Sequence, residues 1–145
     1  MRMMTISFLL LACVSVPANA GYVPSTTQRV TDAAIEKYAL VKISTTTKRV
    51  VPLATTDSGA LMTGIAQAAA GGSGVTIPVL EVYGVASNVI SDGTGVISVG
   101  DLVDLSSTTA GRVMKATNSP TADPNTVCTA ITSAVAVAGT IFQCL

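Results

Sequence analysis

Residues 31–47 of this chain read TDAAIEKYALVKISTTT, and residues 93–109 read GTGVISVGDLVDLSSTT. The two stretches align without a gap, and apolar positions of the first fall on apolar positions of the second. Ile35 aligns with Ile97, and Leu40 aligns with Leu102. Thr, Val and Ala are common in this chain, so single matches carry little weight. An ungapped register over the whole stretch is better explained by internal duplication than by chance similarity.

The match resumes downstream and defines two copies, residues 31–80 and 93–145. In each copy a strand ends in a Thr-rich turn, and a second strand begins at Arg-Val. A small-residue loop then leads to a T-x-I-x-x-A-x-A segment, a Gly turn and a last strand. The residues matched in this part, first copy to second, are Arg49 to Arg112, Thr63 to Thr129, Ile65 to Ile131, Ala68 to Ala134, Ala70 to Ala136, Gly74 to Gly139 and Leu80 to Leu145.

The residue types favour strands over helices. Val, Ile and Ala dominate the apolar content, and Thr, Ser and Gly dominate the polar content, which is typical of pleated strands joined by small-residue turns. We therefore expect an all-β fold with minor helical turns, arranged as one compact β-barrel or sandwich built from the duplicated motif. Only residues 32–38 and 63–70 are compatible with a turn or two of helix. Pro78 lacks an N–H donor, so its strand is predicted to lie at an edge or a bulge.

The charge content limits the functions open to this chain. Its 145 residues carry eight basic and eight acidic side chains, a net charge of zero, and no run of either sign. Direct nucleic-acid binding is not expected, because phosphate contacts need concentrated Lys and Arg. Charged residues make up 11% of the chain, so much of the surface is expected to be hidden against partners. Few charges keep copies apart, and we expect a homo-oligomer in the form of a trimer.

Catalysis is not expected either. The chain contains no histidine, which removes His-based acid–base chemistry, Ser-His triads and His metal sites. The acidic residues are scattered, and those in Asp-Gly and Asp-Ser-Gly sequences are typical turn formers. We therefore predict a binding protein rather than an enzyme, with no catalytic residues, no cofactor and no metal site.

Residues 1–27 are expected to be an N-terminal arm or a signal peptide, and residues 28–145 a single β-rich domain. An apolar run followed by the A-x-A sequence at 18–20 is typical of a cleaved signal peptide. The sequence Leu-Leu-Ala-Cys that ends at Cys13 is compatible with lipidation, and no membrane contact is expected apart from such an anchor or signal. A retained arm would instead bury its apolar stretch against a neighbouring subunit or another partner. The partner-binding residues expected there are Phe8, Leu9, Leu10 and Leu11.

Two further sets of residues are candidates for a role. Arg49 and Arg112 occupy equivalent sites after the Thr-rich turns, so pseudosymmetry could direct both toward one partner surface. Cys128 and Cys144 could form a disulfide in an oxidising compartment. We favour free thiols, because the alignment places both cysteines at apolar positions where a free Cys acts as a small hydrophobe. In that alignment Cys128 stands in place of Met62, and Cys144 in place of Val79.

Several short motifs resemble the capsid cement, or decoration, proteins of tailed bacteriophages. The matching segments are Gly100–Val103, Gly111–Val113 and the Ala-rich stretch Gly64–Gly71. The resemblance covers residues 28–145 and implies a compact β domain, often trimeric, without catalysis or a cofactor. Such a domain lies on the outer capsid surface of the virion and bridges subunits of the major capsid protein. The alternative is an exported surface or periplasmic β-domain with a cleaved signal peptide or a lipid anchor.

Overall fold

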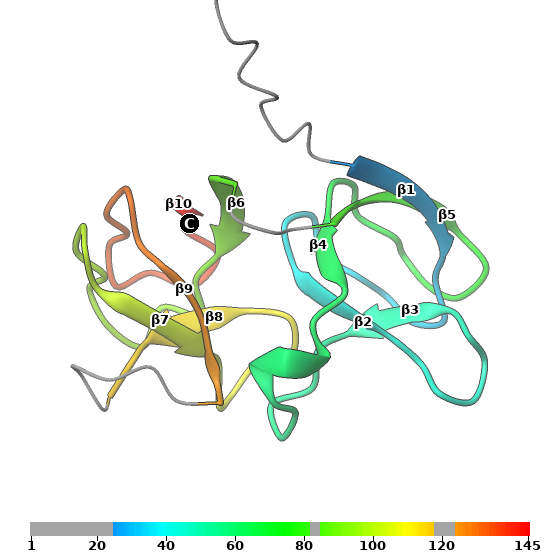
Figure 1. Ribbon diagram of the computed structural model, residues 1–145, viewed down its shortest axis with the longest axis horizontal. Coiled ribbons are helices and arrows are strands. Elements are labelled where there is room, and N and C mark those ends of the chain that lie inside the picture. Colours follow the sequence, from blue (N-terminus) through cyan, green and yellow to red (C-terminus); the bar gives the residue numbers. More distant parts are fainter. Residues whose placement is uncertain (1–24, 82–84, 118–123) are drawn as a thin grey trace, which may run out of the picture.

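The computed structural model describes residues 25–81, 85–117 and 124–145, and these form a nearly all-β structure. Their strands fall into two lobes that lie side by side in Figure 1. The predicted all-β class is confirmed, and the described residues form several antiparallel sheets. We call the lobes repeat 1 (residues 25–81) and repeat 2 (residues 87–145).

Each repeat contains five strands among its described residues. Repeat 1 holds β1 (Ser25–Val30), β2 (Leu40–Ile43), β3 (Val50–Pro52), β4 (Gly64–Ala66) and β5 (Thr76–Glu81), with a short 3₁₀ turn η1 (Gly59–Leu61). Repeat 2 holds β6 (Ser87–Ile90), β7 (Leu102–Leu105), β8 (Val113–Lys115), β9 (Thr126–Thr129) and β10 (Ile141–Cys144).

The strand order is the same in both repeats. Repeat 1 forms one antiparallel sheet in the order β1-β5-β4-β2-β3. Repeat 2 follows the corresponding order β6-β10-β9-β7-β8, but its sheet is split between β10 and β9. A bridge between Ala130 and Cys144 and the mutual hydrogen bonds of Thr129 and Leu145 join the two parts. Both repeats therefore use one topology, which is the arrangement that a duplicated sequence produces.

The strand register corrects part of the sequence alignment. Leu40 pairs with Ile65 in repeat 1, and Leu102 pairs with Thr129 in repeat 2. Ile65 therefore corresponds to Thr129, and the predicted match of Ile65 to Ile131 was wrong by two residues. A shift of two residues keeps every side chain on the same face of a strand, so the apolar pattern could not reveal it.

The first strand of each repeat was absent from the sequence prediction. β1 pairs with β5 as β6 pairs with β10, and the residues that follow them also correspond. Thr31 forms a parallel bridge with Val50, and Ser91 forms the same bridge with Val113. Repeat 2 has two more residues than repeat 1 between this bridge and the buried isoleucine (Ile35 or Ile97). The ungapped alignment therefore matched Thr31 to Gly93 instead of to Ser91, and it did not extend back to the first strand.

Two hydrophobic clusters form the core. Ile35 and Ile97 are both buried, as expected, and so is Leu40, whereas Leu102 is only half-buried. The first cluster belongs to repeat 1. The second cluster combines Leu40, Leu53 and Ile65 of repeat 1 with nine residues of repeat 2. The repeats thus share a core, and their relative placement is fixed by packing.

Three local expectations were wrong. Residues 32–38 form bends around the bridge between Ile35 and Ala70, and residues 64–66 form β4 rather than helix. β5 is an interior strand, although Pro78 was predicted at an edge or bulge. The ladder with β4 ends at Val79, and beyond it Pro78 only accepts a 2.8 Å hydrogen bond from the Gln67 N–H. The sheet tolerates the proline because its missing donor lies past the end of β4.

Candidate protein-docking face

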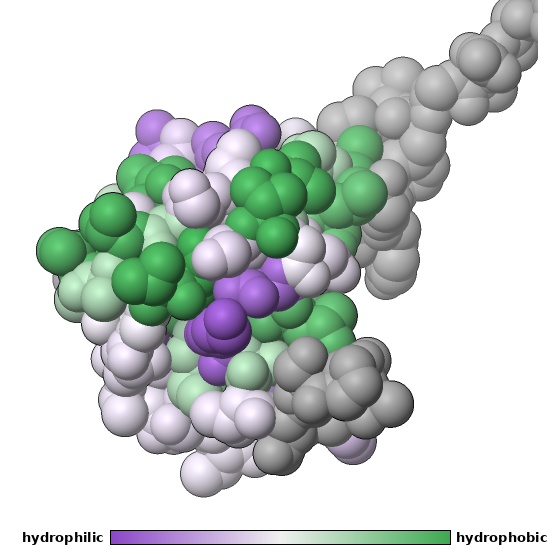
Figure 2. Space-filling view, turned by 90° about the vertical axis from the view of Figure 1, so that its left-hand side faces the viewer, coloured by the Kyte–Doolittle hydropathy of each residue, from purple (hydrophilic) through white to green (hydrophobic). Residues whose placement is uncertain are grey.

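Repeat 2 exposes a group of large apolar side chains. Several of them are more than half exposed, including Val99 at 67%, Val135 at 61% and Val137 at 60%. Figure 2 looks onto this lobe and shows apolar side chains gathered at its surface, with a few polar groups between them. We define the apolar face of repeat 2 as Val96, Val99, Ile131, Val135, Val137 and Ile141.

Backbone contacts bring these residues together from two segments. The bridge between Ile97 and Ala134 places Val96 beside Val135. The Gly100 N–H donates to the Ala130 carbonyl at 2.8 Å, which brings Val99 and Ile131 close to one another. The face is therefore built by the pairing of residues 96–100 with the 130–141 segment.

The corresponding positions of repeat 1 are small or polar. Lys37 corresponds to Val99, Gln67 to Ile131 and Thr76 to Ile141. The same fold is therefore made without apolar side chains at these sites. Single exposed apolar residues are ordinary, but a gathered group that the fold does not need is typical of a protein–protein contact surface. Covering each side chain would contribute about 1 to 3 kcal/mol to association.

A disulfide closes the loop that carries four of the six residues of the face. Cys128 of β9 and Cys144 of β10 are bonded, with 5.7 Å between their Cα atoms and 16 residues of sequence separation. Ile131, Val135, Val137 and Ile141 lie inside the closed loop. A covalent link across the base of a loop reduces the conformations that the loop can adopt, so the disulfide holds these residues in place.

The prediction of free thiols was wrong, and the register explains the error. Cys128 corresponds to Gly64 rather than to Met62, while Cys144 corresponds to Val79, as the alignment had it. In repeat 1 a Cβ atom placed on Gly64 would lie 2.8 Å from a methyl group of Val79. The two positions are therefore direct neighbours in this fold. In repeat 1 Gly64 and Val79 pack against each other, and in repeat 2 the corresponding Cys128 and Cys144 form a disulfide.

A buried carboxylate fixes the neighbouring turn. Asp92 accepts hydrogen bonds from the Ser106 hydroxyl at 2.6 Å and from the Thr94 N–H and hydroxyl at 2.9 and 2.7 Å. Burial acts against the charged form of Asp92, but these hydrogen bonds outweigh it and lower the pKa of the carboxyl below its ordinary value. Asp92 thus ties the start of repeat 2 to its Thr-rich turn.

The two arginines singled out from the sequence do not act alike. Arg112 makes two hydrogen bonds of 2.8 Å to the Glu36 carboxylate of repeat 1. Arg49 stays within its own repeat, with a 3.3 Å hydrogen bond to Ser73 and a 4.0 Å ion pair with Asp32. Arg112 is therefore paired with the other repeat of the same chain, and its role toward a partner stays a prediction. The other predicted contact residues, Phe8, Leu9, Leu10 and Leu11, lie outside the described residues.

An apolar cleft of about 230 Å³ lies between the repeats. Its lining includes Leu40, Met62 and Ile65 from repeat 1, with Val89, Val127 and Leu145 from repeat 2. Ser87 provides the one hydroxyl group among its described lining residues. Within the described ranges, no group of three acidic or cysteine side chains could hold a metal ion, and no helix is long and apolar enough to cross a membrane.

Fold and face together define a class: a β protein of two lobes that share one topology, with an exposed apolar face on repeat 2. Comparison with protein-family models gave no match, and a search of the curated proteins found no relative.

Proposed function

We propose that this chain is a structural capsid decoration protein, whose apolar face on repeat 2 docks on the major capsid protein. The observation that carries the proposal is the difference between the repeats at equivalent exposed positions. Val99 and Ile141 in repeat 2 stand where repeat 1 has Lys37 and Thr76. Repeat 1 thus shows that the fold forms without this apolar surface, and repeat 2 provides an apolar surface whose burial against a partner is favourable.

The choice of partner rests on the resemblance of the repeated motifs to phage cement proteins. The low charge content supports it, because a weakly charged face suits the joints between capsid subunits. Area buried across such joints stabilises the assembled shell against the outward pressure of packaged DNA, since a ligand that binds only the assembled state stabilises that state.

The first test of this proposal is the protein content of virions. Particles purified from cells that produce the chain are analysed by mass spectrometry, and the chain is expected in a fixed ratio to the major capsid protein. Its absence from purified particles would contradict the proposal. Partial removal of the chain should lower the temperature at which the particles release their DNA.

The disulfide favours a second candidate, the exported β-domain. Disulfides such as Cys128–Cys144 form and persist in oxidising compartments, and residues 1–20 have the features of a signal peptide. The mature N-terminus distinguishes the two candidates. Gly21 or a lipidated Cys13 at the N-terminus would support export, whereas Met1 or the loss of only the initiator Met would support a retained arm.

A further inference from the structure

The two repeats are joined by a turn of repeat 2 that inserts into repeat 1. The Gly111 N–H donates to the Leu53 carbonyl at 2.8 Å, and the Gly111 carbonyl accepts from the Leu40 N–H at 2.7 Å. Arg112 follows, and its Nε and Nη2 each donate a hydrogen bond to the Glu36 carboxylate. We call Gly111 and Arg112 the docking turn, and we define the receiving surface as Glu36, Ala39, Leu40, Pro52 and Leu53.

The docking turn fits only because Gly111 has no side chain. A Cβ atom on Gly111 would lie 3.0 Å from the Ala39 Cβ and 3.2 Å from the Leu40 carbonyl oxygen. The φ angle of Gly111 is +76°, a conformation that residues with a Cβ atom rarely adopt. The junction therefore depends on a glycine in the turn and on small side chains opposite it.

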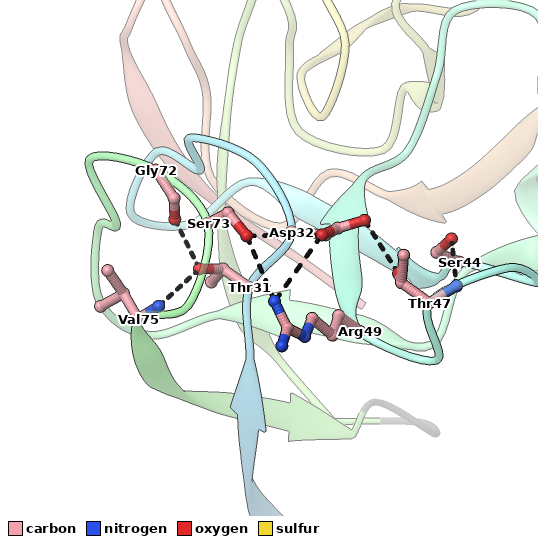
Figure 3. A network of polar contacts seen from close by, with 8 residues as sticks. All are labelled: Thr31, Asp32, Ser44, Thr47, Arg49, Gly72, Ser73 and Val75. Atoms are coloured by element: carbon pink, nitrogen blue, oxygen red, sulfur yellow. Dashed lines mark hydrogen bonds and ion pairs between the residues drawn. The ribbon is translucent and has the colours of Figure 1, made fainter.

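The junction is heterologous, because different surfaces of the two repeats meet. The turn of repeat 1 that corresponds to the docking turn is Lys48–Arg49, and both of its residues are exposed. It follows β2 on the side of repeat 1 away from repeat 2 (Figure 1). Its turn is held by its own repeat, where Thr47 donates to Asp32 at 2.8 Å and Arg49 lies beside Asp32 and Ser73 (Figure 3).

A heterologous junction leaves a free turn at one end and a free receiving surface at the other. On repeat 2 the receiving surface consists of Ser98, Asp101, Leu102, Lys115 and Ala116, in place of Glu36, Ala39, Leu40, Pro52 and Leu53. Leu102 is half-buried where Leu40 is 1% exposed, so this surface is open. Asp101 and Lys115 form a 2.8 Å ion pair across it.

We propose that the Lys48–Arg49 turn of one copy and the receiving surface on repeat 2 of a second copy have the backbone arrangement needed to form the same junction. Lys48, Asp101 and Lys115 prevent the two copies from joining in this way. This inference does not depend on the proposed function. Heterologous contacts that do not close into a ring extend into filaments, so a protein with such ends needs a feature that stops growth.

Each of the three residues acts against docking in a definite way. Lys48 keeps the left-handed turn, with φ of +60°, but adds a side chain at a position where even a Cβ atom would crowd the receiving surface, at 3.0 Å from the Ala39 Cβ in the existing junction. Asp101 is larger than Ala39, its counterpart in the tightest contact of the junction. Lys115 places a positive charge opposite Lys48. Ser98 replaces Glu36, so Arg49 would lose water without gaining a carboxylate partner.

The test transfers the junction residues to the free ends in two separate chains. One variant carries Lys48→Gly in the turn, and the other carries Ser98→Glu, Asp101→Ala and Lys115→Pro on the surface. In sedimentation velocity each variant should behave as the wild-type chain does. An equal mixture should form one new complex that contains one unit of each variant. A chain with all four substitutions should form longer assemblies that grow with concentration.

A fifth substitution, Arg49→Ala, should reverse this assembly, because it removes the partner of the introduced Glu at position 98. A four-substitution chain that melts cooperatively yet sediments as the wild type would overturn the proposal. The wild-type junction gives an independent check if the surface variant does not fold. Gly111→Lys should raise the hydrogen-exchange rate of the Leu40 amide at least tenfold, and an unchanged rate would also overturn the proposal.

Discussion

Among single residues, Asp92 makes a concentrated set of polar contacts. Its two carboxylate oxygens accept from Ser106, Thr94 and Thr108. The same position in repeat 1 is Asp32, which is half-buried and accepts a 2.8 Å hydrogen bond from the Thr47 hydroxyl. An aspartate that anchors the Thr-rich turn is thus a shared element of the motif, and burial makes the copy in repeat 2 the more important one for stability.

Asp92→Asn is therefore expected to lower the free energy of unfolding by about 1 to 3 kcal/mol, because hydroxyl donors lose a charged acceptor. The pKa of Asp92 is lower in the folded than in the unfolded chain, so its contribution is present above about pH 4 and is lost as the pH falls through the folded pKa. Urea unfolding between pH 2 and 7 measures both effects. Asp32→Asn is the matched control and should cost less, and equal losses would contradict this assignment.

Gly64 is the second residue whose role is specific. A methyl group at Gly64 would collide with the Leu80 carbonyl and with the Val79 side chain. Gly64→Ala should destabilise the protein by about 1 to 3 kcal/mol, since the neighbouring strand must move. Gly71→Ala, at a site where a Cβ atom meets nothing within 4 Å, is the control and should be nearly neutral in thermal unfolding. A neutral Gly64→Ala would mean that β4 and β5 are less closely packed than described.

At the scale of secondary-structure elements, the contact between β9 and β10 differs from its counterpart in repeat 1 by a covalent link. Repeat 2 keeps the backbone pairing of β4 with β5, since Thr129 and Leu145 exchange hydrogen bonds of 2.8 and 2.9 Å, and adds the Cys128–Cys144 disulfide. Removal of the disulfide by Cys128→Ala and Cys144→Val should cost about 2 to 4 kcal/mol in urea unfolding. Hydrogen exchange should increase in residues 129–143, where the loop is no longer closed.

A reducing agent provides the control for this prediction. It should destabilise the wild-type chain by a similar amount and leave the double variant unchanged. If the reducing agent has no effect on the wild type, the cysteines do not stabilise the loop, and the apolar face is held by its hydrogen bonds alone.

The sequence predicted the elements better than their register. Ile35, Ile97 and Leu40 were correctly placed in the core, and the strand-turn-strand unit around each Thr-rich turn was correct. Alternating apolar residues cannot distinguish registers that differ by two, so Ile65 was matched to Ile131 instead of Thr129. That error also concealed the disulfide, because it moved Cys128 away from the position beside Val79.

The same two-residue error in the alignment also concealed the candidate site. With Ile131 matched to Ile65, an exposed apolar residue was compared with a core residue, and its surface position could not be recognised. In the correct register Ile131 corresponds to Gln67, and the contrast between the repeats becomes visible. Arg112 was chosen from its equivalence to Arg49, but heterologous packing of the repeats gives equivalent residues different surroundings.

At the scale of the whole molecule, duplication has produced two lobes with different surfaces. Repeat 1 receives the docking turn of repeat 2 and contributes Leu40, Leu53 and Ile65 to a shared core. Repeat 2 exposes the apolar face on the surface seen in Figure 2. Association through this face needs no change in fold, so its loss should weaken docking and leave stability nearly unchanged.

The most direct test exchanges face residues for their repeat 1 counterparts, Val99→Lys, Ile131→Gln and Ile141→Thr, and measures binding to capsids that lack the chain. We predict binding at least about 100-fold weaker, equivalent to about 3 kcal/mol, with an unchanged unfolding transition. The control, Val30→Thr with Leu61→Gln, alters exposed apolar residues of repeat 1 and should bind as the wild type does. A folded face variant that binds capsids as tightly as the wild type would contradict the account.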